Sequence, residues 1–247
     1  MFPIGDDNSD RTITPYVNYL IIALNVLVFL FLQGMSGDNV FTYSYATVPA
    51  EILTGRDVVT DAKVLTDPYT GQHVTIPGLG PTPSPVYITL LTSMFMHGGI
   101  AHIAGNMLYL WIFGDNIENA IGHRRYLFFY LLCGIIASLS HVFATKLLGQ
   151  NQLIPSLGAS GAISGVLGAY ILLFPRRRVT MLFIRFITHV SAFWAIGIWI
   201  LFQLINGLGM LGGSDAGDVA YAAHLGGFIA GMGLIKFFVP RKVAYGG

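Results

Sequence analysis

A serine and a histidine at the starts of two apolar segments form the first chemical candidate in this sequence. Ser160 follows the letters LGA, and His224 follows the letters YAA. A serine hydroxyl attacks a carbonyl carbon when a neighbouring base takes its proton, and imidazole is such a base near neutral pH. A dyad is favoured over a triad, because the acids nearest to His224 in the sequence are Asp215 and Asp218, in the adjoining loop.

Polar side chains at the start of another apolar segment would complement this pair. His102 and Asn106 are four residues apart, so on a helix they share one face. The tetrahedral intermediate of acyl transfer needs hydrogen-bond donors aimed at its oxyanion. The two side chains, with the backbone N–H of Ser160, therefore predict an oxyanion site.

The elements that must position these residues are predicted to cross a membrane. Of 247 residues, 54% are hydrophobic and 10% are charged, whereas soluble domains carry about 25% charged residues. A helix of about 20 apolar residues spans a bilayer. The pattern predicts an all-α polytopic membrane protein whose six transmembrane helices lie at about 17–33, 96–114, 125–146, 155–174, 179–205 and 220–238.

The positions of lysine and arginine predict the orientation of these spans. Cytoplasmic loops retain positive charge, and an N-in, C-in arrangement places most of the basic residues inside. The second, fourth and sixth spans then begin at the outer face, so Ser160 and His224 are expected at the same depth in the membrane. The predicted organisation is a cytoplasmic N-terminus (1–16), a six-helix membrane domain (17–240) with a long first outer loop (34–95), and a short cytoplasmic tail (241–247).

Small residues recur every four positions beside both candidate catalytic residues. This spacing lets transmembrane backbones approach closely. The fourth and sixth spans are therefore expected to pack through Gly161, Gly165 and Ala169, and through Ala223, Gly227 and Gly231.

In these motifs the chain resembles the rhomboid family of intramembrane serine proteases. Three motifs stand in the same order as in that family, and an acidic-and-glycine signature follows the second span. The matching residues are His97, His102 and Asn106; Gly158, Ser160 and Gly161; His224, Gly227 and Gly231; and Glu118 with Gly122.

The resemblance implies a six-helix, rhomboid-like bundle that needs no cofactor and no metal. Ser160 would be the nucleophile, His224 the general base, and His102 with Asn106 part of the oxyanion site, whereas His97 would be supporting. The implied substrates are transmembrane proteins cut within or next to the lipid bilayer, and the fifth span would gate their entry. The compact six-span form suggests the bacterial inner membrane.

Two residues depart from the family pattern. The family often has arginine where this chain has Thr89, and an aromatic residue that stacks on the catalytic histidine where it has Ser164. Ser164 is therefore a second candidate nucleophile, and a catalytically inactive rhomboid-like protein that binds membrane clients is the alternative function.

Other functions have less support in the sequence. A metal-dependent protease using His97, His102 and His224 would need a glutamate near a histidine pair, and none is present. A small transporter would need acidic or lysine residues near the centres of its spans, and the predicted spans have none there. A net charge of +1 without a basic patch argues against nucleic-acid binding.

Overall fold

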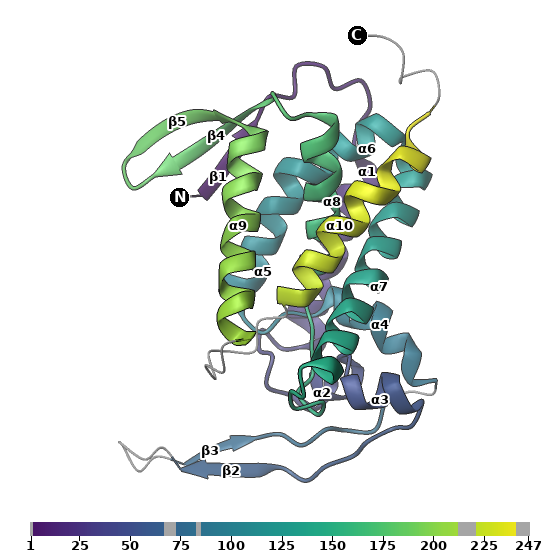
Figure 1. The fold of residues 1–247 in the computed structure, drawn as a ribbon. Helices are drawn as coiled ribbons and strands as arrows, with labels where there is room; N and C mark the ends of the chain where they lie inside the picture. Colours follow the sequence, from purple (N-terminus) through teal and green to yellow (C-terminus); the bar gives the residue numbers. More distant parts are fainter. Residues whose placement is uncertain (1, 67–72, 83–84, 212–220, 241–247) are drawn as a thin grey trace.

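The fold is a bundle of helices with one small sheet at each end. The computed structural model describes residues 2–66, 73–82, 85–211 and 221–240. One sheet has the strand order β1-β4-β5 and the other pairs β2 with β3. The two sheets extend sideways from opposite ends of the bundle (Figure 1).

Ten α-helices and five strands are found in the described residues. Helical segments of other pitch extend them: Val28–Leu32 continues α1, Leu110–Gly114 joins α5 to α6, and Val86–Ile88 and Ser93–Phe95 flank α4. The helices are α1 (Tyr16–Leu27), α2 (Val40–Tyr45), α3 (Pro49–Thr54), α4 (Thr89–Thr92), α5 (Ile100–Tyr109), α6 (Asp115–Ile121), α7 (His123–Leu147), α8 (Ser160–Leu173), α9 (Ala192–Leu211) and α10 (Tyr221–Phe238). The strands are β1 (Phe2–Asp6), β2 (Lys63–Thr66), β3 (His73–Ile76), β4 (Arg178–Phe183) and β5 (Phe186–Ser191).

Two of the described helices, α7 and α10, are long and apolar enough to cross a membrane. A third span results if Val86–Phe95 and Ile100–Ile121, which meet at a bend of 80°, are counted together. Three shorter apolar helices complete the set: Tyr16–Leu32, Ser160–Leu173 and Ala192–Ile205. A helix thus lies at each predicted span, whereas the six-span topology and its orientation remain predictions.

The predicted fifth span, 179–205, was wrong in its first half. Residues 178–191 form the antiparallel β4–β5 hairpin, and α9 begins only at Ala192. The physical reason is that burial alternates with a period of two, as in a strand: Val179 and Met181 are buried, whereas Thr180 and Leu182 are only partly buried. Absence of charge therefore predicted the apolar character of this segment but not its conformation.

Other predicted boundaries and the all-α class also need correction. Residues 155–159 are not helical, so α8 starts at Ser160. The expected N-terminal tail contains β1, which pairs with β4, and the expected outer loop 34–95 contains α2, α3, β2, β3 and α4. The predicted tail 241–247 lies outside the described residues.

Glu118 holds the start of α1. Its side chain is fully buried, and its two carboxylate oxygens accept hydrogen bonds from the backbone N–H groups of Val17 (3.0 Å) and Asn18 (2.7 Å). Pro15 at the N-cap of α1 provides no side-chain cap, so this carboxylate satisfies N–H groups that otherwise lack partners. The ring Nδ1 of His123 also contacts Glu118.

Helices α8 and α10 are in backbone contact through their glycines, as their spacing predicted. A Cβ atom on Gly227 would lie 2.1 Å from the carbonyl oxygen of Gly161, and one on Gly231 would lie 1.9 Å from that of Gly165. On the side of α8 that faces α7, a Cβ on Gly165 would lie 2.5 Å from Cys133. The two helices therefore run parallel, in a register that leaves no room for larger side chains.

We predict that Gly231→Ala lowers the free energy of unfolding by about 1–3 kcal/mol, because the added methyl group forces α8 and α10 apart. Thermal unfolding in detergent micelles measures the change. Gly233→Ala is the matched control, since a Cβ at Gly233, in the same helix, would meet nothing within 4 Å. Equal melting temperatures for the two variants would contradict the contact.

Candidate active site

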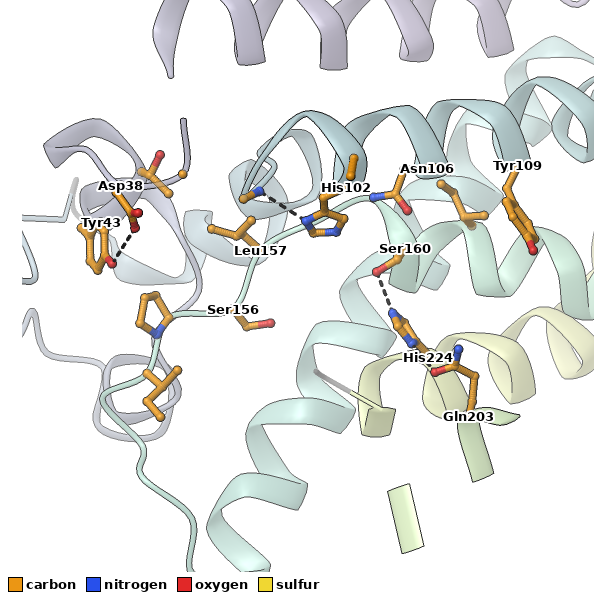
Figure 2. Close-up of a pocket in the computed structure, with 18 of the residues that line it drawn as sticks. Asp38, Tyr43, His102, Asn106, Tyr109, Ser156, Leu157, Ser160, Gln203 and His224 are labelled. Atoms are coloured by element: carbon orange, nitrogen blue, oxygen red, sulfur yellow. Dashed lines mark hydrogen bonds between the residues drawn. The ribbon is translucent and has the colours of Figure 1, made fainter. Parts of the chain in front are cut away.

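The two residues predicted as nucleophile and base are in direct contact. Ser160 Oγ and His224 Nε2 are 2.7 Å apart (Figure 2). Ser160 is the first residue of α8, and His224 lies in the first turn of α10. The close glycine contact between these parallel helices brings the hydroxyl within hydrogen-bond distance of the imidazole.

Gln203 on α9 orients the imidazole of His224, and the sequence analysis missed it. The Oε1 atom of Gln203 lies 2.9 Å from His224 Nδ1. An amide oxygen only accepts hydrogen bonds, so Nδ1 carries the proton and Nε2 keeps a lone pair for the Ser160 hydroxyl. Trp199, one turn earlier on α9, places its ring centroid 6.0 Å from that of His224. A glutamine in an otherwise apolar span was the available signal.

His102 has the opposite tautomer. The backbone N–H of Gly98 donates to His102 Nδ1 at 3.2 Å, so the proton of the neutral ring is on Nε2. A Cβ atom on Gly158 would lie 3.0 Å from that Nε2, and Gly158 has a φ of +128°, which favours glycine. Glycine at this position therefore lets the ring of His102 lie directly beside the segment that leads to Ser160.

Asn106 lies one turn after His102 on α5, and His97 is in contact with the ring of His102. The Nδ2 atom of Asn106 is buried and has no hydrogen-bond partner in the described part of the chain. His97 is fully buried, and its ring stands edge-on to that of His102 with centroids 5.1 Å apart. The side chain of Gln33 holds the backbone of His97 from both sides, through its N–H (2.9 Å) and its carbonyl oxygen (3.0 Å). His97 thus packs against His102.

The Ser160–His224 pair opens onto a cavity of about 830 Å³. Residues from α5, α8, α9 and α10 line it, together with the segments 37–43 and 154–157 (Figure 2). The residues labelled there are Asp38, Tyr43, His102, Asn106, Tyr109, Ser156, Leu157, Ser160, Gln203 and His224. The residues predicted for the nucleophile, the base and the oxyanion site all face this one cavity.

Other sequence candidates lie outside the cavity. The hydroxyl of Ser164 donates to the carbonyl oxygen of Ser160 at 2.6 Å, one turn deeper in α8, and it does not line the cavity. Thr89 is buried, and its hydroxyl donates to the carbonyl oxygen of Val86 at 2.8 Å. The Glu118 carboxylate accepts hydrogen bonds from the backbone at the start of α1. Asp215 and Asp218 lie outside the described residues.

The three histidines considered for a metal site do not converge. His102 Nδ1 accepts from Gly98, and both ring nitrogens of His224 face protein groups. Among the residues that the structure describes, no group of three His, Cys, Asp or Glu side chains has a geometry that would hold a metal ion.

Comparison with known proteins agrees with the motifs. Residues 85–241 match the family model of the Rhomboid domain. The chain is 34% identical over 157 residues to "Rhomboid protein 1, mitochondrial" of Saccharomyces cerevisiae, covering 63% of this chain and 43% of that protein. It is 36% identical over 161 residues to "Rhomboid protease GluP" of Bacillus subtilis, covering 64% and 27% respectively.

A human relative, "Presenilin-associated rhomboid-like protein, mitochondrial", is 32% identical over 148 residues, covering 60% of this chain and 37% of that protein. The chain thus spans less than half the length of each of these relatives. Because two of the three are named as mitochondrial, they give no support to the expected bacterial inner membrane. The Rhomboid domain match covers more than half of the chain and contains all the motif residues, so this membrane protein belongs to the rhomboid family.

Proposed function

We propose that this protein is an intramembrane serine endopeptidase that cuts transmembrane proteins through an acyl-enzyme on Ser160. The observation that carries the proposal is the 2.7 Å contact between Ser160 Oγ and His224 Nε2 at the wall of a cavity. In this proposal six spans cross the bilayer with both termini on the cytoplasmic side, namely α1, the α5–α6 unit, α7, α8, α9 and α10.

The first step forms the acyl-enzyme. Ser160 Oγ attacks the carbonyl carbon of the scissile peptide bond while His224 Nε2 takes the hydroxyl proton. Gln203 stabilises the imidazolium that results, because its Oε1 already accepts a hydrogen bond from Nδ1–H of His224. When the tetrahedral intermediate collapses, the C–N bond breaks and the leaving amine receives the proton from His224.

The oxyanion of this intermediate would be held by three donors. His102 Nε2–H and Asn106 Nδ2 supply side-chain donors, and the backbone N–H of Ser160 at the start of α8 is free of intrahelical bonds. His102 and Asn106 line the same cavity as Ser160, and hydrogen-bond donors already in place around a developing charge stabilise it strongly. The buried amide of Asn106, which has no hydrogen-bond partner in the described part of the chain, supports this role.

The second step releases the acyl group. A water molecule attacks the ester carbonyl as His224 Nε2 takes its proton, and the bond to Ser160 Oγ breaks as that oxygen regains a proton. The cavity provides room for both water and an unwound substrate segment. Membrane-spanning substrates are proposed because α9, which forms one wall, also exposes large apolar residues on its outer side, among them Trp194, Leu201 and Ile205.

We predict that a fluorophosphonate probe labels the detergent-solubilised protein at Ser160. Labelling is expected to be lost in Ser160→Ala and His224→Ala and kept in Ser164→Ala, because the Ser164 hydroxyl is already bonded to a carbonyl oxygen. Gel fluorescence with an active rhomboid protease as positive control measures this. A folded parent protein that stays unlabelled would favour the inactive, client-binding alternative.

We predict that His102→Ala and Asn106→Ala each reduce kcat by about 10²–10³-fold, the usual loss for one oxyanion donor. Cleavage of a transmembrane substrate in proteoliposomes measures the rate, and thermal unfolding checks that each variant is folded. Unchanged rates in both variants would remove these side chains from the oxyanion site.

We predict that Gln203→Leu lowers kcat by about tenfold or more with little change in KM, because His224 loses the acceptor that selects its tautomer. Gln203→Glu is the matched rescue variant, since it keeps an acceptor oxygen at the same distance along the side chain. The two kinetic constants are measured in proteoliposomes. If both variants lose activity equally, the role of Gln203 is packing and not hydrogen bonding.

A further inference from the structure

The β4–β5 hairpin extends beyond the bundle at the end opposite to the candidate site (Figure 1). Helix α8 separates them, since its 14 residues between Ser160 and Leu173 are about 20 Å long. The base of the hairpin packs on the core, where Val179 and Met181 are buried. No other part of the described chain covers the distal half in this way.

Four large apolar side chains are exposed at the tip. Their exposed fractions are 50% for Phe183, 82% for Ile184, 74% for Phe186 and 63% for Ile187. Successive residues of a strand point to opposite faces, so the tip is apolar on both faces. Neither face of the tip therefore offers a polar surface to water.

The turn of this hairpin also carries an apolar residue where the backbone disfavours it. Ile184 has a φ of +56° in a two-residue turn between Phe183 and Phe186, a position usually taken by glycine or asparagine. A β-branched residue is strained there. Because its side chain is mostly exposed, the described part of the chain offers nothing that offsets the strain. An apolar environment outside the chain would offset it.

Basic residues accompany the apolar tip. Arg185 lies in the turn, and Arg176 and Arg178 are exposed near the base, whereas Arg177 is paired with Asp10 of the N-terminal segment. Arginine beside exposed aromatic and aliphatic residues is typical of segments that lie at the boundary between anionic headgroups and acyl chains.

The apolar surface continues from the hairpin onto α9. The backbone N–H of Ala192 donates to the carbonyl oxygen of Arg177 (2.8 Å), and that of Phe193 donates to Pro175 (3.0 Å). These bonds join the base of the hairpin to the start of α9, where Phe193 and Trp194 are also exposed. The depth of the hairpin in a membrane therefore sets the depth of the helix that carries Gln203.

We propose that the hairpin tip, residues 183–187, is a lipid-binding element that inserts into the headgroup boundary of an anionic leaflet beside α9. The proposal does not depend on proteolytic activity. It commits to lipid as the occupant because both faces of the tip are apolar and arginines flank it.

Spin-label accessibility in proteoliposomes tests the proposal. Ile184→Cys is labelled in a Cys133→Ala background, in phosphatidylcholine vesicles with and without phosphatidylglycerol. Collision rates with oxygen and with a water-soluble nickel chelate are then compared. Ser9→Cys, in an exposed polar turn, is the aqueous control, and Ile229→Cys, exposed on α10, is the bilayer control.

The expected result is an oxygen-to-nickel collision ratio at position 184 several-fold above that at Ser9→Cys and below that at Ile229→Cys, which lies midway along α10. The ratio should be higher with phosphatidylglycerol, and Arg185→Gln should remove that difference. A label at position 184 that is as accessible to the nickel chelate as the label at Ser9→Cys would overturn the proposal. A label shielded from both oxygen and nickel would also overturn it, because it would indicate that a second protein chain covers the tip. A ratio indifferent to phosphatidylglycerol would overturn the anionic preference.

Discussion

The contact between the backbones of α8 and α10 is the constraint on which the candidate site depends. A Cβ atom at Gly227 or Gly231 would overlap carbonyl oxygens of α8, so the distance between the helices is set by the absence of side chains. Ser160 and His224 stand at the same end of these parallel helices, and their 2.7 Å contact follows from that distance. The geometry of the candidate dyad is therefore a consequence of helix packing.

The two histidines of the site differ in tautomer because their neighbours differ. Gln203 presents an acceptor to His224, and Gly98 presents a donor to His102. The first ring is therefore prepared to take a proton from Ser160, and the second to donate a hydrogen bond toward the cavity. Two side chains of one type thus suit the roles of base and oxyanion donor without any change of charge in the resting protein.

The ends of the bundle are built from different interactions. On the side away from Ser160, Glu118 holds the start of α1, and β1 pairs with β4, so polar and strand contacts tie the N-terminal segment to the hairpin that precedes α9. On the side of the site, glycines and histidines pack closely around a cavity. The hairpin is bonded in turn to the start of α9, so the position of the helix that carries Gln203 depends on contacts made at the far end of the bundle.

The apolar helices, the glycine contact and four residues of the cavity wall, Ser160, His224, His102 and Asn106, could be predicted from the sequence, because each depends on local periodicity or on motif spacing. The sequence did not determine the β4–β5 hairpin, since an uncharged apolar run is compatible with helix or strand until packing of Val179 and Met181 selects the strand. It also missed Gln203, which is 21 residues from His224 in the chain. Only the tertiary structure brings these two side chains together, because the contact depends on how α9 packs beside α10.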